Sequence, residues 1–301
     1  MARRRPSSRL RVRAAVLACG LVLAGLGAHP ARADPPVWRV IGPKAQVELF
    51  GSIHLLPSAT RWMTPALQRE LDGAQALYFE IPLDAESRAD AQALIRGRGL
   101  LPEGEKLSSE LPPRLWTRMQ ALAKRDGLNP AMLERMRPWL AELTLTVGFY
   151  QRAGYSQDLG VESRIDAAAP PTAERDAFET LDQQISLLAD GSQADQIASL
   201  KETLDEIGAD PGLFERAADA WRRGDVQGLI REVIDPMRKE DAEVYRRLIV
   251  ERNRRFATKI EAIARGGGPA RVFVVLGVGH LVGPEGVPTL LRRDGLEVEG
   301  P

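Results

Sequence analysis

Two stretches decide the fold of this chain: residues 46–54, QVELFGSIH, and residues 271–280, RVFVVLGVGH. Each is an apolar, strand-like run that leads into a glycine and, three residues after it, a histidine. Apart from a basic leader described below, His54 and His280 are the only histidines of the chain. Strand ends in α/β proteins are where ligands and catalytic groups are usually found. The sequence therefore predicts that both imidazoles are delivered at strand ends.

The two stretches belong to a weak internal repeat. In each, Gly-x-x-His-Leu is followed by a proline, an apolar helix and another short strand. We expect the two units to lie side by side in one sheet, so that His54 and His280 converge. The glycine three residues before each histidine is expected to permit a tight turn with an unusual φ angle that aims the ring.

The first residues have the pattern of a targeting signal. Residues 1–13 carry six arginines, residues 14–28 are apolar, and Ala31-Arg32-Ala33 is a small-x-small cleavage site. We interpret residues 1–33 as a signal peptide and residues 34–301 as one domain, and we expect an exported, periplasmic or secreted protein. Without the leader the chain loses its single cysteine, so no disulfide or cysteine nucleophile is expected.

Charge narrows the set of partners. Basic and acidic residues number 41 each, and the leader holds seven arginines and no acid, which leaves a net charge of −7 on residues 34–301. A nucleic-acid partner is therefore not expected. No stretch after the leader approaches the length of a spanning helix, so no transmembrane segment is expected either.

The element pattern predicts an α/β protein with a mixed sheet built from both ends of the chain. Strand patterns occur at about 37–82, which includes a hairpin (38–41 and 46–50), a short helix from Thr64 to Asp72 and a strand at 76–81, and again at about 270–300. Residues 84–265 read as mostly helical, with prolines at several helix starts. The expected architecture is a sheet with a large central helical insertion.

The residue types suggest a metal centre. Neutral imidazole is a common metal ligand, and a hydrolytic site uses two or three protein ligands with a position open for water. Glu80 is the best third ligand because it is an acid at the end of an apolar strand. Glu80 could instead be a general base, in which case Glu48 or Glu162 would complete the ligand set. The set suits zinc, manganese, cobalt or iron.

Each of these residues also has a structural reading. A single histidine is more often a hydrogen-bonded structural residue than a ligand, and Glu80, Glu48 and Glu162 could be surface acids. The matching glycine-histidine spacing in both stretches favours a functional role for His54 and His280. The presence of these two histidines favours a functional role for Glu80 as well.

A second polar feature lies on the helix expected from about 242 to 264. Arg252 falls within an apolar stripe at helical spacing, with Asn253 at its edge. A buried guanidinium needs a partner, so Arg252 forms either a structural ion pair or a contact to a substrate carboxylate or oxyanion. Tyr150 and Tyr155 could donate to an intermediate, although packing is the simpler assumption.

The chain resembles the TraB/GumN family, which includes the Tiki proteins. The resemblance rests on signatures in the expected order along nearly the whole chain after the leader: GSIHLLP (51–57), the strand ending in Glu80, RPWL (137–140), GVE (160–162), FETLDQQ (178–184), AWRRGD (220–225), Arg252-Asn253 and GVGHLVG (277–283). Two departures are mild: Glu162 replaces a common aspartate, and Ser52 replaces a common threonine.

The resemblance implies a metal-dependent hydrolase, peptidase-like as in Tiki-type relatives, with a fold akin to erythromycin-esterase-like and ChaN-like proteins. It also implies a metal held by His54, Glu80 and His280, with Arg252 and Asn253 contacting the substrate or transition state. The substrate, a peptide or another small molecule, is not specified. The competing hypothesis is an exported accessory protein that binds a metal or ligand without turnover.

Overall fold

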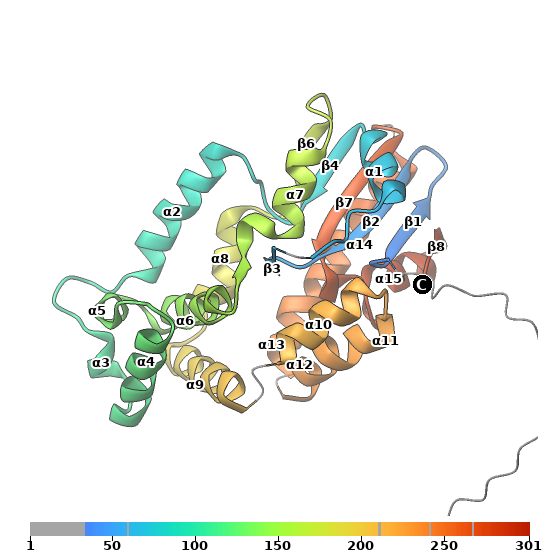
Figure 1. Cartoon of the computed structure of the whole chain (residues 1–301). Helices are drawn as coiled ribbons and strands as arrows, with labels where there is room; N and C mark the ends of the chain where they lie inside the picture. The colour runs from blue at the N-terminus through green and yellow to red at the C-terminus, as the bar shows by residue number, and fades with distance from the viewer. Residues whose placement is uncertain (1–33, 59, 210–211, 241, 267) are drawn as a thin grey trace, which may run out of the picture. The chain divides into compact units, whose positions relative to one another are not determined.

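A six-stranded mixed sheet organises the computed structural model, which describes residues 34–58, 60–209, 212–240, 242–266 and 268–301. Its strands lie in the order β6-β4-β7-β2-β1-β8 (Figure 1). Their bounds are β1 (Val37–Ile41), β2 (Gln46–Ser52), β4 (Ala76–Phe79), β6 (Glu174–Ala177), β7 (Arg271–Gly277) and β8 (Glu297–Glu299). A separate antiparallel pair joins β3 (Leu56–Pro57) to β5 (Tyr155–Ser156). The predicted signal peptide lies outside the described residues.

The stretches 46–54 and 271–280 contain β2 and β7, which are neighbouring parallel strands at the centre of the sheet. β2 pairs with β7 from Gln46↔Arg271 to Ser52↔Gly277. Both strands are almost entirely buried, as is typical of parallel strands covered on both faces. The expectation that the two units lie side by side is confirmed.

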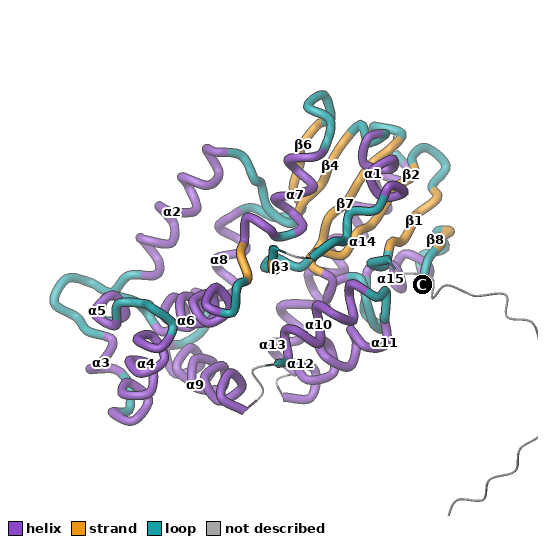
Figure 2. The backbone as a smooth tube through the Cα atoms, in the orientation of Figure 1, coloured by secondary structure: helices purple, strands orange, loops and turns teal. Residues whose placement is uncertain are grey.

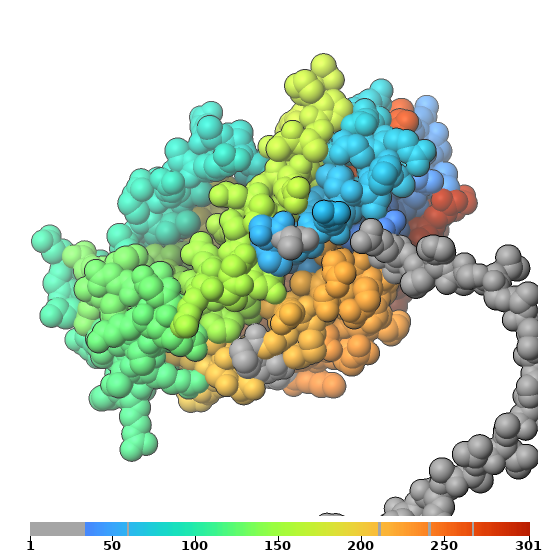
Figure 3. Space-filling view, viewed as in Figure 1, coloured from blue at the N-terminus to red at the C-terminus, as the bar shows by residue number. Residues whose placement is uncertain are grey.

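The ends of the domain also meet at the other edge of the sheet. β1 forms the predicted hairpin with β2, and β8 then pairs antiparallel with β1. In the space-filling view the blue and red segments accordingly adjoin (Figure 3). This arrangement confirms a mixed sheet to which both termini of residues 34–301 contribute.

The expected division into end strands and a helical insertion is wrong in one respect. β6 comes from the middle of the chain and pairs parallel with β4. It was missed because its four residues, Glu174–Ala177, are mostly exposed and charged. An edge strand of this kind lacks the apolar pattern that identifies a buried strand.

Helices pack around the sheet and make up most of the chain between β4 and β7. None of those in the described residues is long and apolar enough to cross a membrane. Their bounds are α1 (Pro65–Asp72), α2 (Ala85–Gly99), α3 (Leu107–Glu110), α4 (Pro113–Arg125), α5 (Pro130–Leu133), α6 (Pro138–Arg152), α7 (Val161–Ala168), α8 (Leu181–Ala189), α9 (Gln193–Ala209), α10 (Leu213–Arg222), α11 (Val226–Leu229), α12 (Asp235–Glu240), α13 (Ala242–Tyr245), α14 (Glu251–Arg265) and α15 (Val287–Arg293).

Two main hydrophobic cores result. The larger covers the sheet and includes Trp38, Phe50 and Trp221, all almost completely buried. The second lies among α3, α4, α5, α6 and α9, away from the sheet, around residues such as Met119 and Leu145 (Figure 2). The helical part of the chain therefore has apolar packing of its own, separate from the core around the sheet.

Candidate metal centre

Four polar side chains follow four neighbouring parallel strands. His54 comes shortly after β2, Glu80 directly after β4, and His280 shortly after β7. Glu179 follows β6. Because the carboxyl ends of parallel strands meet at one edge of a sheet, these residues are gathered there by topology alone.

Gly277 marks the point where they meet. Its backbone N–H donates to Glu80 Oε1 at 2.6 Å, and His280 Nε2 lies 3.7 Å from the same oxygen. A Cβ atom placed on Gly277 would lie 3.9 Å from His54 Nε2 and 3.6 Å from the His280 ring. The structure thus brings His54, Glu80 and His280 around one point.

The glycines before the histidines serve close approach. Neither Gly51 nor Gly277 has a positive φ, so the expected unusual backbone angle is wrong. A Cβ on Gly51 would lie 2.9 Å from Val278 Cγ2, and one on Gly277 would lie 3.0 Å from Glu80 Oε1. Glycine is needed here because the two strand ends and Glu80 pack too tightly for a side chain.

His54 is oriented by Glu162 at the start of α7. Val161 N–H donates to Ile53 O at 3.1 Å, and a Cβ on Gly160 would collide with His54 O at 2.3 Å. This contact places Glu162 Oε1 2.5 Å from His54 Nδ1 and raises the pKa of His54 to about 9. The His54 side chain is 66 % exposed, so solvent screening weakens the effect. The ring keeps its Nε2 edge towards Glu80.

His280 is oriented by Asn253. Asn253 Nδ2 donates to the Glu285 carbonyl at 2.7 Å, which turns Oδ1 towards His280 Nδ1 at 2.6 Å. In this arrangement Nδ1 carries the proton and the Nε2 lone pair faces Glu80 and Arg252. Tyr245 in turn donates to Glu285 Oε2 at 2.8 Å. Asn253 therefore lies behind His280, and its amide is not free for the substrate contact that the resemblance implied.

Arg252 is the buried cation of the centre. Its Nη2 donates to Glu80 Oε2 at 2.6 Å and to Glu179 Oε2 at 2.7 Å. Its Nη1 lies 2.9 Å from His280 Nε2. Of the two readings left open by the sequence, the structural ion pair is the one present in this structure.

Glu179 was not among the predicted site residues. It is almost fully buried and also accepts from Arg255 Nη2 at 2.8 Å. Its backbone N–H donates to Glu80 O at 2.8 Å, so the two acids lie close together just beyond the ends of β6 and β4. The signal was available in the sequence, because the same dipeptide, Phe-Glu, occurs at the end of β4 (Phe79-Glu80) and directly after β6 (Phe178-Glu179).

A π-helical turn precedes the Arg252-Asn253 pair. The helix expected from 242 to 264 is interrupted by a π turn, Arg246–Val250, between α13 and α14. Such turns are frequent at functional sites. Arg252 and Asn253 are both buried just beyond it, one reaching Glu80 and the other His280.

Three further candidates are not brought to this point. Glu48 lies in the middle of β2 and is bound by Arg39 and by Gln46 Nε2. Tyr150 and Tyr155 pack with Phe214, their ring centroids lying 4.5 Å and 5.3 Å from it. Packing is therefore what the structure shows for the two tyrosines.

Burial shapes the charges of the centre. It opposes ionisation of Glu80, but His280, Arg252 and His54 together with the Gly277 N–H outweigh it and lower the pKa of Glu80 to about 2. Burial lowers the pKa of His280 to about 4. At neutral pH His280 is therefore neutral, and Arg252 and His54 are the cationic groups that favour ionised Glu80.

The donor set suits a divalent metal, although its present arrangement does not close around one. Both imidazoles have Nδ1 held by an oxygen acceptor, the usual arrangement for histidine ligands that bind through Nε2. Within the described ranges, however, no group of three or more His, Cys, Asp or Glu side chains is placed so that it could hold a metal ion. Arg252 Nη1 occupies the hydrogen-bonding position at His280 Nε2, and it would have to move before a metal could bind there.

The fold and this centre define an α/β protein with paired strand-end histidines and a buried carboxylate. A model of the TraB/PrgY/gumN family matches residues 36–300, and the chain belongs to that family. It is similar to Metalloprotease TIKI1 from Danio rerio, with 24% identity over 83% of this chain and 60% of the relative. The chain thus spans less than two thirds of that relative's length. No solved structure matches the chain.

Proposed function

We propose that the protein is an exported metal-dependent hydrolase with peptidase-like activity. The observation that carries the proposal is the convergence of His54, Glu80 and His280 at the ends of three neighbouring parallel strands, with both rings oriented through Nδ1. Family membership and the similarity to a protein named as a metalloprotease support it. Export rests on the leader pattern of residues 1–33.

In this proposal the Nε2 atoms of His54 and His280 and the Glu80 carboxylate hold the metal. When bound, the metal would supply a water of lowered pKa and polarise a substrate carbonyl. Glu162 and Asn253 hold the two rings in their binding orientation. Arg252, released from His280, is placed to bind a substrate carboxylate or a developing oxyanion.

The test uses protein without the leader, stripped of metal and then loaded separately with manganese, cobalt, zinc or iron(II). Cleavage of a peptide library is measured by mass spectrometry, beside elemental analysis of the protein as purified. We expect cleavage with at least one metal. His54→Ala and His280→Ala should lose it, whereas Met132→Ala, a change at an exposed residue of α5, should not.

Circular dichroism confirms that each variant is folded. A wild-type protein that binds metal but cleaves no peptide would contradict the catalytic part of the proposal. A protein that neither contains metal as purified nor takes it up on titration would contradict the whole.

One observation favours a second candidate, a non-catalytic accessory protein that binds ligands. The guanidinium of Arg252 already neutralises Glu80 and caps His280 Nε2, so the buried charges are balanced without a metal. In that case ligand binding should survive His54→Ala, because no hydrogen bond joins His54 to Arg252.

A further inference from the structure

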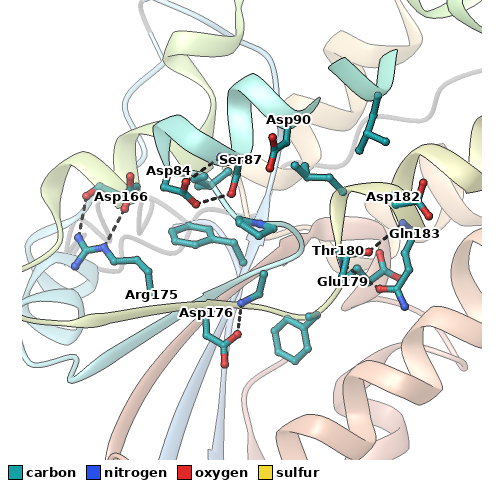
Figure 4. A pocket seen from close by; sticks show the side chains of 17 residues that line it. Asp84, Ser87, Asp90, Asp166, Arg175, Asp176, Glu179, Thr180, Asp182 and Gln183 are labelled. Atoms are coloured by element: carbon teal, nitrogen blue, oxygen red, sulfur yellow. Dashed lines mark hydrogen bonds and ion pairs between the residues drawn. The ribbon is translucent and has the colours of Figure 1, made fainter. Parts of the chain in front are cut away.

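A cleft of about 700 Å³ opens beside the candidate centre, within the size range of ligand sites. Its walls are the first half of α2 on one side and the ends of β4 and β6 with the first turn of α8 on the other. Figure 4 shows Ser87 and Asp90 on α2, with Asp84 just before its first turn and Asp176 on the strand opposite. Every residue that lines the cleft belongs to the described part of the chain.

The lining combines apolar side chains with acidic ones. The apolar side chains come from both walls: Phe79, Pro82, Leu83, Leu94, Phe178 and Leu181. The charged lining residues are six acids and one base: Asp84, Asp90, Asp166, Asp176, Glu179, Asp182 and Arg175. Arg175 does not offset the negative charge of the other five acids, because its Nε is bound to Asp166 at 3.2 Å.

Several of these acids have cations of their own. Glu179 is bound by Arg252 and Arg255, Asp182 by Arg98, and Asp176 lies 3.5 Å from Lys259. In the described ranges, no salt bridge joins Asp84 or Asp90 to a basic side chain. The unbalanced negative charge of the cleft therefore lies on the α2 wall.

The helix ends at the cleft do not make it a site for anions. The first turn of α2 is capped by Asp84, whose Oδ1 accepts from Ser87 N–H at 2.9 Å. The first turn of α8 is closed by a capping box between Thr180 and Gln183. Donors that could have bound a phosphate or carboxylate are thus already used within the chain.

The cleft adjoins the candidate centre, with Glu179 and the first turn of α8 between them. Glu179 lines the cleft, and its carboxylate binds Arg252. Gln183 also lines the cleft, while the next residue, Gln184, donates to Glu80 Oε2 at 3.4 Å. A chain lying in the cleft would cross the first turn of α8 to reach Glu80.

From this geometry we propose that the cleft binds the substrate of the centre as an extended peptide segment that carries lysine or arginine next to apolar side chains. The apolar lining residues contact the apolar side chains of the peptide, and Asp84 and Asp90 face its cationic side chains. The inference rests on the proposed function for the identity of the segment as substrate. Binding itself does not depend on turnover.

The test measures binding without metal, in the presence of a chelator, by fluorescence anisotropy. The probes are a labelled short peptide in which lysine and leucine alternate and a matched peptide with glutamate in place of lysine. We expect the protein to bind the lysine peptide more tightly, and we expect added salt to weaken that binding. Asp90→Asn should weaken it, and Asp90→Lys should weaken it further, by about fivefold to tenfold.

The matched control is Glu103→Lys, the same change of charge at an exposed acid in the turn between α2 and α3 that does not line the cleft. Equal binding of the two peptides, or equal losses in Asp90→Lys and Glu103→Lys, would overturn the proposal. Binding of the lysine peptide without cleavage under any metal would leave this proposal standing and contradict the proposed hydrolase. Cleavage that is indifferent to Asp90→Lys would do the reverse.

Discussion

At the scale of single residues, the main interaction of the centre is made by Arg252, which lies between two buried carboxylates. Removing one partner of a buried ion pair leaves an uncompensated charge, which costs far more than an exposed pair is worth. This makes Arg252 a structural residue of the centre whatever else it does.

Arg252→Met is accordingly expected to lower the free energy of unfolding by about 3 to 5 kcal/mol, because Glu80 and Glu179 lose their shared cation. Urea denaturation measures the change. Arg255→Met is the control: its side chain is 55 % exposed and binds the same Glu179, and it should cost less than about 1 kcal/mol. Similar losses in both variants would show that burial of the ion pair does not matter.

A second prediction concerns Asn253, which is fully buried behind His280. Asn253→Ala leaves the His280 Nδ1–H and the Glu285 carbonyl without partners, so we expect a loss of about 1 to 3 kcal/mol in urea denaturation. Asn253→Asp keeps an acceptor for Nδ1, but its second oxygen faces the Glu285 carbonyl without a proton to donate, so it should lose stability as well. If the alanine variant is as stable as the wild type, the assigned hydrogen bonds are not formed.

Among single residues, the sequence identified His54, Glu80, His280, Arg252 and Asn253 as a set, and the structure gathers all five. It could not assign their contacts. Whether Asn253 faces a substrate or supports His280 depends on the position of the Glu285 carbonyl, 32 residues away in sequence. Such contacts have no local sequence pattern.

At the scale of elements, the packing of α6 against α9 contains a half-buried acid, Glu142. Burial raises the pKa of Glu142, opposed by hydrogen bonds from Thr203 and Ser199, which lie 2.7 Å and 3.0 Å from its Oε1. The folded state therefore holds this proton more tightly than the unfolded state. Stability from this group is complete below the ordinary pKa of glutamate and falls as the pH rises through the raised pKa.

Glu142→Gln should remove that loss while keeping an acceptor for both hydroxyls. We expect the variant to be more stable than the wild type at neutral pH, by less than about 1 kcal/mol, and the difference to vanish near pH 3. Thermal unfolding across this pH range measures it. Glu103→Gln, at an exposed position, should show no such trend, and a wild type that is the more stable at neutral pH would contradict the prediction.

Elements with a buried face were predictable and an exposed one was not. The hairpin of β1 and β2, the strand β7 and the helix α1 follow from apolar periodicity and from Thr64, whose side chain caps α1 as expected. β6 was missed because its exposed residues carry no such pattern. The π turn before α14 was not predicted from the sequence.

At the scale of the whole molecule, the proposed function predicts that a metal stabilises the folded chain. A ligand that binds only the native state at about a hundred times its dissociation constant adds about 2.7 kcal/mol, which raises the melting temperature by roughly 5 °C for a chain of this size. Scanning calorimetry of metal-stripped protein with and without added metal measures the shift. His54→Ala and His280→Ala should abolish it, and an undiminished shift in both variants would place the metal elsewhere.

The sequence by itself determined the class of the molecule: two apolar strands with matching glycine-histidine ends, an acid ending a third strand, and signatures from residue 51 to residue 283 in the order of one family. Burial and periodicity act on neighbouring residues, so they can be read from the chain. Only the tertiary structure decided that β6 lies beside β4, that Glu179 joins Glu80 on Arg252, and that Arg252 occupies the face of His280 towards Glu80. These contacts link segments more than twenty residues apart, and packing of the whole domain selects them.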